Sequence, residues 1–175
     1  LAPEVLHVTN PGLVITRVTG FGQTGPYRDR TAFATQAEAL SGFAAINGDP
    51  DGPPLLPPIA LTDEVAALVG AFATMVAVHS GVGQVVDVNL IESMLQLMGP
   101  LVPLYGLLGR TQQRLGAGIP YTVPRNTYRC SDGGWIAVSS SAESVAQRVL
   151  ELIGLGGDDR FRGFEARVAH RELID

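Results

Sequence analysis

A long apolar run at residues 63–79 constrains the fold of this chain more than any other feature of the sequence. Because it is apolar on nearly all faces, the run is typical of a helix that lies inside a layered core. Short, β-branched segments at residues 13–18 and 84–88 stand before and after it, and each is typical of a buried strand. This order of strand, helix and strand favours an α/β architecture.

Further helices are predicted on both sides of the apolar run. Residues 33–40 show a short helical pattern, and Asn89 is a suitable N-cap for another helix, with Glu92 three positions further on. Residues 49–58 hold an Asp-Gly pair and several prolines, so no regular structure is expected there.

The second half of the chain changes character after Gly99. Glycines and prolines without a clear period predict a linker over residues 100–124. Two short strands that flank an Asp-Gly turn, within residues 126–139, predict a hairpin. Ser140 and Glu143 then predict a capping box that opens a helix. We therefore expect a linker followed by the start of a small α+β domain.

Charge and composition exclude several classes of function. All 12 basic residues are arginines, they are scattered, and the net charge is −5, so the chain lacks the basic patch that nucleic-acid binding needs. Cys130 is the single cysteine, which excludes an internal disulfide and a cysteine-based zinc cluster, and three scattered histidines predict no metal site. The most apolar stretch, residues 65–78, is shorter than a bilayer span, and no leader peptide is visible. We expect a cytoplasmic protein without a membrane partner.

A glycine-rich loop, Thr-Gly-Phe-Gly-Gln-Thr-Gly-Pro-Tyr at residues 19–27, follows the first predicted strand. Gly20, Gly22 and Gly25 let backbone N–H groups approach a ligand without a Cβ atom in the way. The spacing differs from the dinucleotide-binding fingerprint. On spacing alone, a tight structural loop is the favoured interpretation.

Asp63 stands where the long helix is expected to begin. A carboxylate in the first turn of a helix is kept ionised by the helix dipole and by unpaired N–H groups. An ionised carboxylate is what a nucleophile requires. The simpler interpretation is that Asp63, or Thr62 before it, is an ordinary N-cap. From the residues alone the cap is favoured, and both interpretations stay open.

The order of several motifs along the chain favours a functional interpretation of the loop and of Asp63 over a structural one. Besides the loop, they are Ala-Leu-Ser-Gly at 39–42, Gly-Asp-Pro-Asp-Gly-Pro-Pro at 48–54, Gly-Gln-Val-Val-Asp-Val at 83–88, Asp-Gly-Gly-Trp-Ile-Ala-Val at 132–138, Arg-Phe at 160–161 and Ala-Arg-Val at 166–168. In this order they resemble the family III CoA-transferases, the CaiB/BaiF family. This family includes formyl-CoA and carnitine-CoA transferases and the α-methylacyl-CoA racemases. The resemblance covers nearly the whole chain.

The resemblance implies a fold, substrates and an assembly. The fold is a partial Rossmann-like CoA-binding domain at residues 1–99, the linker, and the start of a small domain at residues 125–175, without the family's N-terminal and C-terminal sections. The substrates are an acyl-CoA and a carboxylic acid, with coenzyme A as a substrate and no permanently bound cofactor. The full-length protein is expected to form an intertwined homodimer.

The resemblance also implies roles for individual residues. Asp63 matches the nucleophilic aspartate of the transferases, whose carboxylate forms first an anhydride with the acyl group and then a thioester with CoA. The residues expected to bind the substrate or CoA lie in the glycine-rich loop. They are Gly20, Phe21, Gly22, Gln23 and Tyr27.

Two alternatives to a transferase stay open. Racemases of this family use a histidine, which falls on Phe33 here, and a glutamate, which falls on Ala142 or, with a slip of one residue, on Glu143. Phenylalanine cannot remove a proton, so a transferase is favoured over a racemase. The second alternative is a truncated, non-catalytic member. Ala67 stands where the family usually has a glycine, and the turn at residues 79–84 is shorter than usual.

Overall fold

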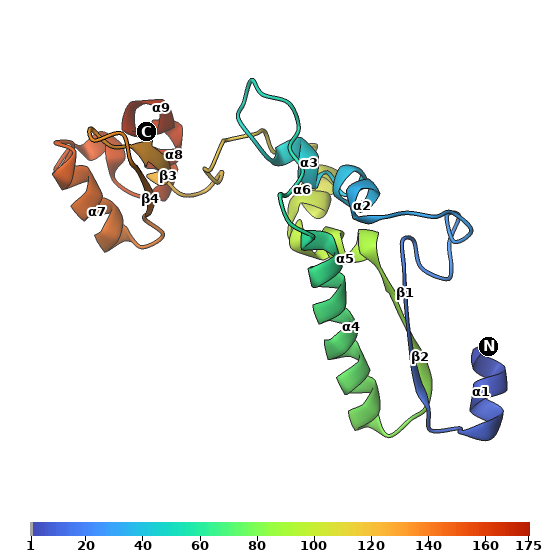
Figure 1. Ribbon diagram of the computed structural model, residues 1–175. Helices are drawn as coiled ribbons and strands as arrows, with labels where there is room; N and C mark the ends of the chain where they lie inside the picture. Colours follow the sequence, from blue (N-terminus) through green and yellow to red (C-terminus); the bar gives the residue numbers. More distant parts are fainter. Residues whose placement is uncertain (1) are drawn as a thin grey trace. The chain divides into compact units, whose positions relative to one another are not determined.

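The computed structural model describes residues 2–175, which form two compact units (Figure 1). The first unit comprises the residues up to Ile46 together with Pro54–Thr111, and the second comprises Asn47–Pro53 together with Gln112–Asp175. Part of the predicted linker is helix α6 (Leu101–Leu108), which belongs to the first unit. The predicted division into domains stays a prediction.

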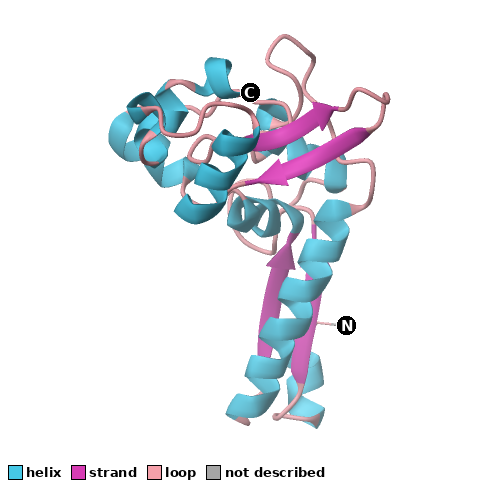
Figure 2. Cartoon of the chain, turned by 90° about the vertical axis from the view of Figure 1, so that its left-hand side faces the viewer, coloured by secondary structure: helices cyan, strands magenta, loops and turns pink. Residues whose placement is uncertain are grey.

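A two-stranded parallel sheet lies at the centre of the first unit. β1 (Val14–Thr19) pairs with β2 (Gln84–Asn89) in register along the whole length of both strands. The connection between them contains α4 (Leu61–Ser80), which covers one face of the sheet and runs opposite to both strands (Figure 1, Figure 2). The α/β architecture and both predicted strands are confirmed, each strand to within one residue.

Helix α4 is buried on one side only. The buried side consists largely of small residues, among them Ala66, Gly70 and Ala77, which let the helix approach the strands closely. Much of the remaining surface of the helix is exposed, including Leu68 and Phe72 at 71% and 74% of their full areas. Within residues 2–175 the two strands cover one face of the helix, so its predicted place inside a layered core holds for that face and stays a prediction for the rest.

The described part of the first unit contains four more helices in addition to α4 and α6: α1 (Pro3–Thr9), α2 (Ala34–Leu40), α3 (Phe43–Ile46) and α5 (Leu90–Leu97). Helix α2 confirms the predicted helical pattern, and residues 49–58 contain no helix or strand, as expected. By length and composition alone α4 would pass for a membrane-spanning helix, and so would α5 and α6 together across a 75° bend. In the structure, however, α4 packs one side on the sheet, so length and composition do not show that it spans a membrane. The expected absence of a membrane partner stays a prediction.

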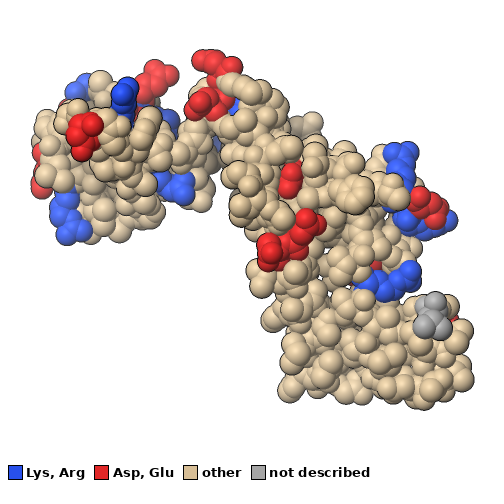
Figure 3. Space-filling view, in the orientation of Figure 1, with Lys and Arg blue, Asp and Glu red and all other residues tan. Residues whose placement is uncertain are grey.

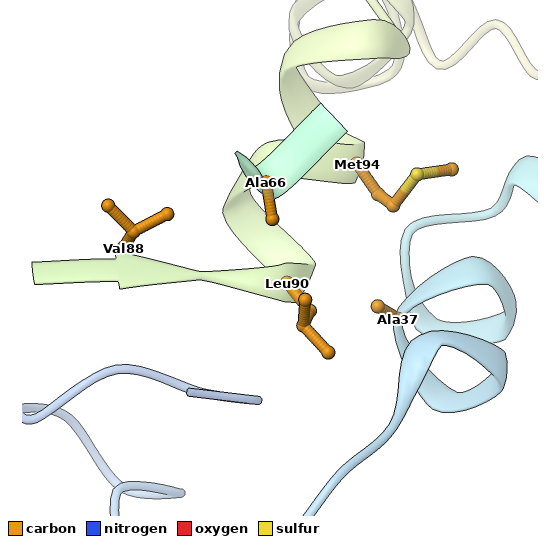
Figure 4. Close-up of a cluster of buried hydrophobic side chains, with 5 residues drawn as sticks. All are labelled: Ala37, Ala66, Val88, Leu90 and Met94. Carbon is orange, nitrogen blue, oxygen red and sulfur yellow. The ribbon is translucent and has the colours of Figure 1, made fainter. Parts of the chain in front are cut away.

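The hydrophobic core of the first unit joins three helices to the sheet. Its buried members come from α2, α4, β2 and α5 (Figure 4): Ala37, Ala66, Val88, Leu90 and Met94. Asn89 caps α5 as predicted, because its Oδ1 accepts a hydrogen bond from the Glu92 backbone N–H at 2.8 Å. This cap and the core together hold the carboxyl end of β2 against the helices.

The second unit is built on an antiparallel hairpin. β3 (Arg125–Arg129) pairs with β4 (Trp135–Ser139), which confirms the predicted hairpin. The chain continues through α7 (Glu143–Leu152), a short 3₁₀ helix (Asp159–Phe161), α8 (Phe164–Ala169) and α9 (Arg171–Ile174). The buried core of this unit consists of Val123, Leu150, Phe161 and Ile174.

The predicted capping box at the start of α7 is wrong. Ser140 donates its hydroxyl hydrogen to the Pro124 carbonyl oxygen, and Glu143 accepts two hydrogen bonds from Arg167, at 2.9 Å each. Arg167 is completely buried and also donates to the Val123 carbonyl oxygen at 3.0 Å. A buried guanidinium needs a carboxylate partner, and this requirement outweighs the local preference for a cap.

Candidate active site

The glycine-rich loop and the start of α4 lie at the same edge of the parallel sheet. The loop directly follows the carboxyl end of β1, and α4 begins at that end because it runs opposite to both strands (Figure 1). Ligands of open α/β sheets bind at the carboxyl ends of the strands. The fold therefore brings both predicted parts of the site to the edge where a ligand is expected.

Side chains of the two strands hold the glycine-rich loop in place. The Gly22 backbone N–H donates to Thr19 Oγ1 at 2.9 Å, and the Gln23 backbone N–H donates to Asp87 Oδ2 at 2.7 Å. Two N–H groups of the loop are thus bonded within the protein. The interpretation in which the loop's N–H groups face a ligand does not hold for these two.

Gly20 and Gly22 allow close contacts between the loop and its surroundings. Gly22 has a φ of +83°, and a Cβ atom there would lie 3.1 Å from Asn89 Nδ2 and 3.3 Å from Asp87 Oδ2. A Cβ atom on Gly20 would lie 2.6 Å from the Cβ of Ala32. The packing of the loop itself therefore requires glycine at both positions.

Phe21, Tyr27 and Arg30 form a small cluster at the loop. The Phe21 and Tyr27 rings meet edge to face with their centroids 5.3 Å apart, and the Arg30 guanidinium lies 4.2 Å from the centre of the Tyr27 ring. Tyr27 is 41% exposed. The loop therefore presents an oriented aromatic ring and a cation to solvent.

Asp63 is exposed in the first turn of α4. The N-cap of this helix is Ala60, so the simpler interpretation of Asp63 or Thr62 as the N-cap is wrong. The Thr62 hydroxyl instead donates to Glu38 Oε1 at 2.9 Å. Among residues 2–175, Asp63 makes no side-chain hydrogen bond or ion pair. Its carboxylate is thus open to solvent, at the positive end of the helix dipole.

A cavity of about 580 Å³ lies between α4, β2 and α5. Its wall combines the apolar side chains of Leu68 and Phe72 with the carboxylates of Asp87 and Glu92. The cavity adjoins the glycine-rich loop through Asp87, which bonds the Gln23 N–H. Asp63 is not part of its wall.

The positions that would serve a racemase offer no suitable base. Phe33 is the N-cap of α2, and Ala142 is the N-cap of α7. Glu143 is paired with buried Arg167, and hydrogen bonds from Arg167 and then Gln147 lower the pKa of Glu143 from 4.5 to about 2. At neutral pH Glu143 is therefore an ionised structural partner and a very weak base.

Charged and metal-binding side chains are dispersed. On the face shown in Figure 3, basic side chains stand in small separate groups among acidic ones. Within the described residues, no three His, Cys, Asp or Glu side chains are grouped so as to hold a metal ion. His7 and His170 bond the backbone carbonyl oxygens of Leu13 and Ala166, at 2.9 Å each. The expected absence of nucleic acid and of a metal stays a prediction.

Two residues that support the site, Glu38 and Asp87, are given no role by the sequence alone. Asp87 stands between valines in a strand, and Glu38 stands between alanines in a short helix. A single acidic residue in an apolar segment is the signal that could have identified both, since such residues are seldom placed there without a partner. Thr62 is considered from the sequence only as an N-cap, and no local pattern indicates its bond to Glu38.

Known proteins match this chain along its length. A family model for CoA-transferase family III matches residues 1–175. Succinyl-CoA–D-citramalate CoA-transferase of Chloroflexus aurantiacus is 41% identical over 98% of this chain and 44% of its own length. The alpha subunit of succinyl-CoA–L-malate CoA-transferase from Chloroflexus aurantiacus is 36% identical over 100% of this chain and 43% of its own length. The chain thus spans less than half the length of these curated relatives.

Solved structures share the fold. A CaiB/BaiF family protein from Brucella suis matches with a TM-score of 0.77 and 29% identity, over 99% of this chain and 48% of that one. The protein Rv3272 from Mycobacterium tuberculosis matches with a TM-score of 0.79 and 26% identity, over 99% of this chain and 49% of that one. The mixed α/β fold, with its small parallel and antiparallel sheets, is therefore the fold of about half of each of these proteins.

Proposed function

Because the chain belongs to CoA-transferase family III, we propose that it carries the nucleophile of an enzyme that moves CoA between an acyl-CoA and a carboxylic acid. The observation that carries this proposal is the exposed Asp63 carboxylate in the first turn of α4, which has no side-chain partner among residues 2–175. A nucleophilic carboxylate must be ionised and reachable. A helix N-terminus at the carboxyl edge of a sheet favours both conditions.

The proposed reaction exchanges CoA through Asp63. One Asp63 oxygen attacks the thioester carbonyl carbon, a C–O bond forms, the C–S bond breaks, and the CoA thiolate leaves a mixed anhydride. The thiolate then attacks the Asp63 carbonyl carbon, which gives an aspartyl-CoA thioester and releases the donor acid. The acceptor carboxylate attacks the carbonyl carbon of this thioester, the C–S bond breaks, and the CoA thiolate leaves again as a second anhydride forms. Attack of the thiolate on the acceptor's carbonyl carbon releases the new acyl-CoA and restores Asp63.

In this proposal the glycine-rich loop contacts the acyl-CoA. Gly20 and Gly22 let the backbone lie close to its surroundings, Phe21 and Tyr27 offer aromatic surface, and Gln23 offers a side-chain amide. Coenzyme A is a substrate here, and no permanently bound cofactor takes part. Each step is a substitution at a carbonyl carbon, for which a carboxylate and a thiolate suffice.

We further propose succinyl-CoA as the donor and a dicarboxylic acid as the acceptor. Relatives at 41% and 36% identity are named for exchange between succinyl-CoA and D-citramalate or L-malate. A relative from Agrobacterium fabrum, 31% identical, is named succinate–glutarate CoA-transferase. The acids in these names all carry two carboxyl groups. A panel of dicarboxylic and monocarboxylic acceptors, assayed with succinyl-CoA, measures this preference directly.

Trapping of an Asp63 adduct tests the proposed nucleophile. The complete protein is mixed with succinyl-CoA and hydroxylamine, and we expect a hydroxamate on the Asp63 peptide by mass spectrometry. Asp63→Asn should lower the exchange rate by about a thousandfold or more, as removal of a covalent nucleophile does. Glu64→Gln is the matched control, because it removes the neighbouring carboxylate of the same turn. Full exchange activity in Asp63→Asn would contradict the proposal.

Two assays of the complete protein, deuterium exchange and CoA transfer, distinguish a transferase from a racemase and from a non-catalytic member. A racemase would exchange the α hydrogen of a 2-methylacyl-CoA for solvent deuterium, and a non-catalytic member would show neither deuterium exchange nor CoA transfer. Phe33 at the histidine position and the pairing of Glu143 with Arg167 support a transferase. Deuterium exchange at the α carbon without CoA transfer would favour the racemase.

We also propose a cytoplasmic protein that forms an intertwined homodimer when complete. Relatives named as the alpha and beta subunits of succinyl-CoA–L-malate CoA-transferase make an assembly of unlike subunits the alternative. Mass photometry of the complete protein, purified alone, should give twice the mass of one chain. A monomer that becomes active only with a second, different chain would contradict the homodimer.

A further inference from the structure

A buried carboxyl group joins α2 to the start of α4. Glu38, on α2, is only 4% exposed, and its Oε1 accepts a hydrogen bond from the Thr62 hydroxyl at 2.9 Å. Thr62 is itself completely buried and directly precedes Asp63. The proposed nucleophile is thus one residue away from a buried polar contact between two helices.

Apolar packing already holds the same two helices together. Ala37 on α2 and Ala66 on α4 belong to one core cluster, and each is 1% exposed (Figure 4). Burying a carboxyl group costs free energy that an apolar side chain at the same place would not cost. Apolar contacts are non-directional, whereas a hydrogen bond depends on the angle between its groups. Apolar packing alone would hold the two helices together. The hydrogen bond between Thr62 and Glu38 therefore restricts how α4 is rotated relative to α2.

We propose that Glu38 is a positioning residue, which sets the direction of the Asp63 carboxylate through Thr62; this inference rests on the proposed function of Asp63. Successive residues of an α-helix are turned by about 100° around its axis. Holding Thr62 toward α2 therefore determines where Asp63 points. Ala60, the N-cap, makes no side-chain hydrogen bond to this turn, so the bond to Glu38 supplies an anchor that the cap does not.

The position of α2 along the chain gives this contact a second consequence. Helix α2 follows the glycine-rich loop, with Tyr27 only seven positions before Ala34. Glu38 thus connects the segment that leaves the loop to the turn that carries Asp63. A displacement of about 1 Å between reacting groups can lower a rate about a hundredfold. Loss of the contact is therefore expected to slow the reaction with little effect on binding.

Steady-state kinetics of the complete protein, with succinyl-CoA and a dicarboxylic acid, test the role of Glu38. Thr62→Val removes the hydroxyl group, and Glu38→Ala removes the acceptor. We expect each to lower kcat by about tenfold or more, while KM for succinyl-CoA changes by less than about twofold. Thr62→Ser and Glu38→Gln retain a donor and an acceptor, so their kcat should stay within about threefold of the wild-type value.

Thr74→Val is the matched control, because Thr74 lies on the same helix and its hydroxyl donates to the Gly70 carbonyl oxygen at 2.6 Å. We expect its kcat to equal that of the wild type. Full kcat in Thr62→Val, or an equal loss in Thr62→Val and Thr62→Ser, overturns the role of Glu38. If Glu38→Ala does not fold, the kcat values of Thr62→Val and Thr62→Ser are sufficient to test the role of Glu38. A wild-type protein that transfers CoA without an Asp63 adduct overturns the proposed function instead.

Discussion

At the scale of single residues, carboxyl groups on one element hold the backbone or side chains of another. Asp87 on β2 accepts a hydrogen bond from the Gln23 N–H in the loop after β1, and Glu38 on α2 accepts one from Thr62 on α4. The loop and the first turn of α4 are the two parts of the candidate site. Each is therefore sensitive to a substitution outside it.

We expect Asp87→Ala to weaken binding of the acyl-CoA. The substitution leaves the Gln23 N–H without its acceptor, and a hydrogen bond to a charged group is worth about 2 kcal/mol. KM for succinyl-CoA should rise about tenfold or more, while Asp87→Asn, which keeps an acceptor oxygen, should raise it less. Steady-state kinetics of the complete protein measure both. An unchanged KM in Asp87→Ala would contradict the proposed role of the loop.

Gly22→Ala should destabilise the protein more than Gly25→Ala. Both glycines have positive φ angles, +83° and +82°, which cost about 1 kcal/mol for any other residue. A new Cβ atom meets Asn89 Nδ2 at 3.1 Å at Gly22, and nothing within 4 Å at Gly25. Urea unfolding should show losses of about 2 and about 1 kcal/mol, respectively. Equal losses would show that the close contact at Gly22 carries no cost.

At the scale of secondary-structure elements, one ion pair joins α7 to α8 in the second unit. Arg167 on α8 is completely buried, and its guanidinium donates to Glu143 on α7 and to the carbonyl oxygens of Val123 and Phe161. Removal of the carboxylate would leave the buried cation with its two carbonyl partners and with the water that reaches the half-exposed position of Glu143. The stability of this unit therefore depends in part on Glu143 remaining ionised.

We expect the second unit to lose stability in acid, between about pH 4.5 and pH 2. Arg167 lowers the pKa of Glu143 from 4.5 to about 2 in the folded state, so the unfolded state takes up the proton first. The contribution is complete above pH 4.5 and is lost as the pH falls toward 2. Because the Glu143 side chain is 46% exposed, we expect about 1 kcal/mol. Glu143→Gln should flatten this part of the profile in urea unfolding, and an unaltered profile would contradict the assignment.

At the scale of the whole chain, each unit has its own core, yet one apolar face of α4 is left uncovered. Leu68, Phe72 and Met75 are 71%, 74% and 64% exposed, and their spacing places them on one side of the helix. The chain covers 44% of the length of succinyl-CoA–D-citramalate CoA-transferase from Chloroflexus aurantiacus. Exposed apolar stripes of this kind favour association with other apolar surfaces.

We expect residues 1–175 prepared by themselves to associate in a concentration-dependent manner, because the apolar face of α4 is removed from water when molecules associate. Sedimentation velocity over a range of concentrations measures this directly. The double substitution Phe72→Glu and Met75→Glu places charges on that face and should lower the association. Substitution of Glu64 by Gln, in the first turn of the same helix, serves as the control. A monomer at every concentration would contradict the expectation.

The sequence by itself determined which segments form helices and strands in much of the chain. β1, β2, the hairpin of the second unit, α2 and the Asn89 cap all follow from patterns of a few neighbouring residues. Such patterns act through local steric preference and local hydrogen bonds, so they can be recognised without knowledge of the fold. The order of the motifs also determined the family, which the match over residues 1–175 confirms.

The tertiary structure alone decided which groups are partners and which faces are covered. Gln23 and Asp87 lie 64 positions apart in the chain, and both Glu38–Thr62 and Glu143–Arg167 are separated by 24 positions. These distant partners explain why the Thr62 hydroxyl is no cap, why Ser140 and Glu143 form no capping box, and why some N–H groups of the loop are already bonded within the protein. Burial of α4 likewise depends on how many strands lie beside it. A hydrogen bond or an apolar contact depends on proximity in space, which no local pattern in the sequence specifies.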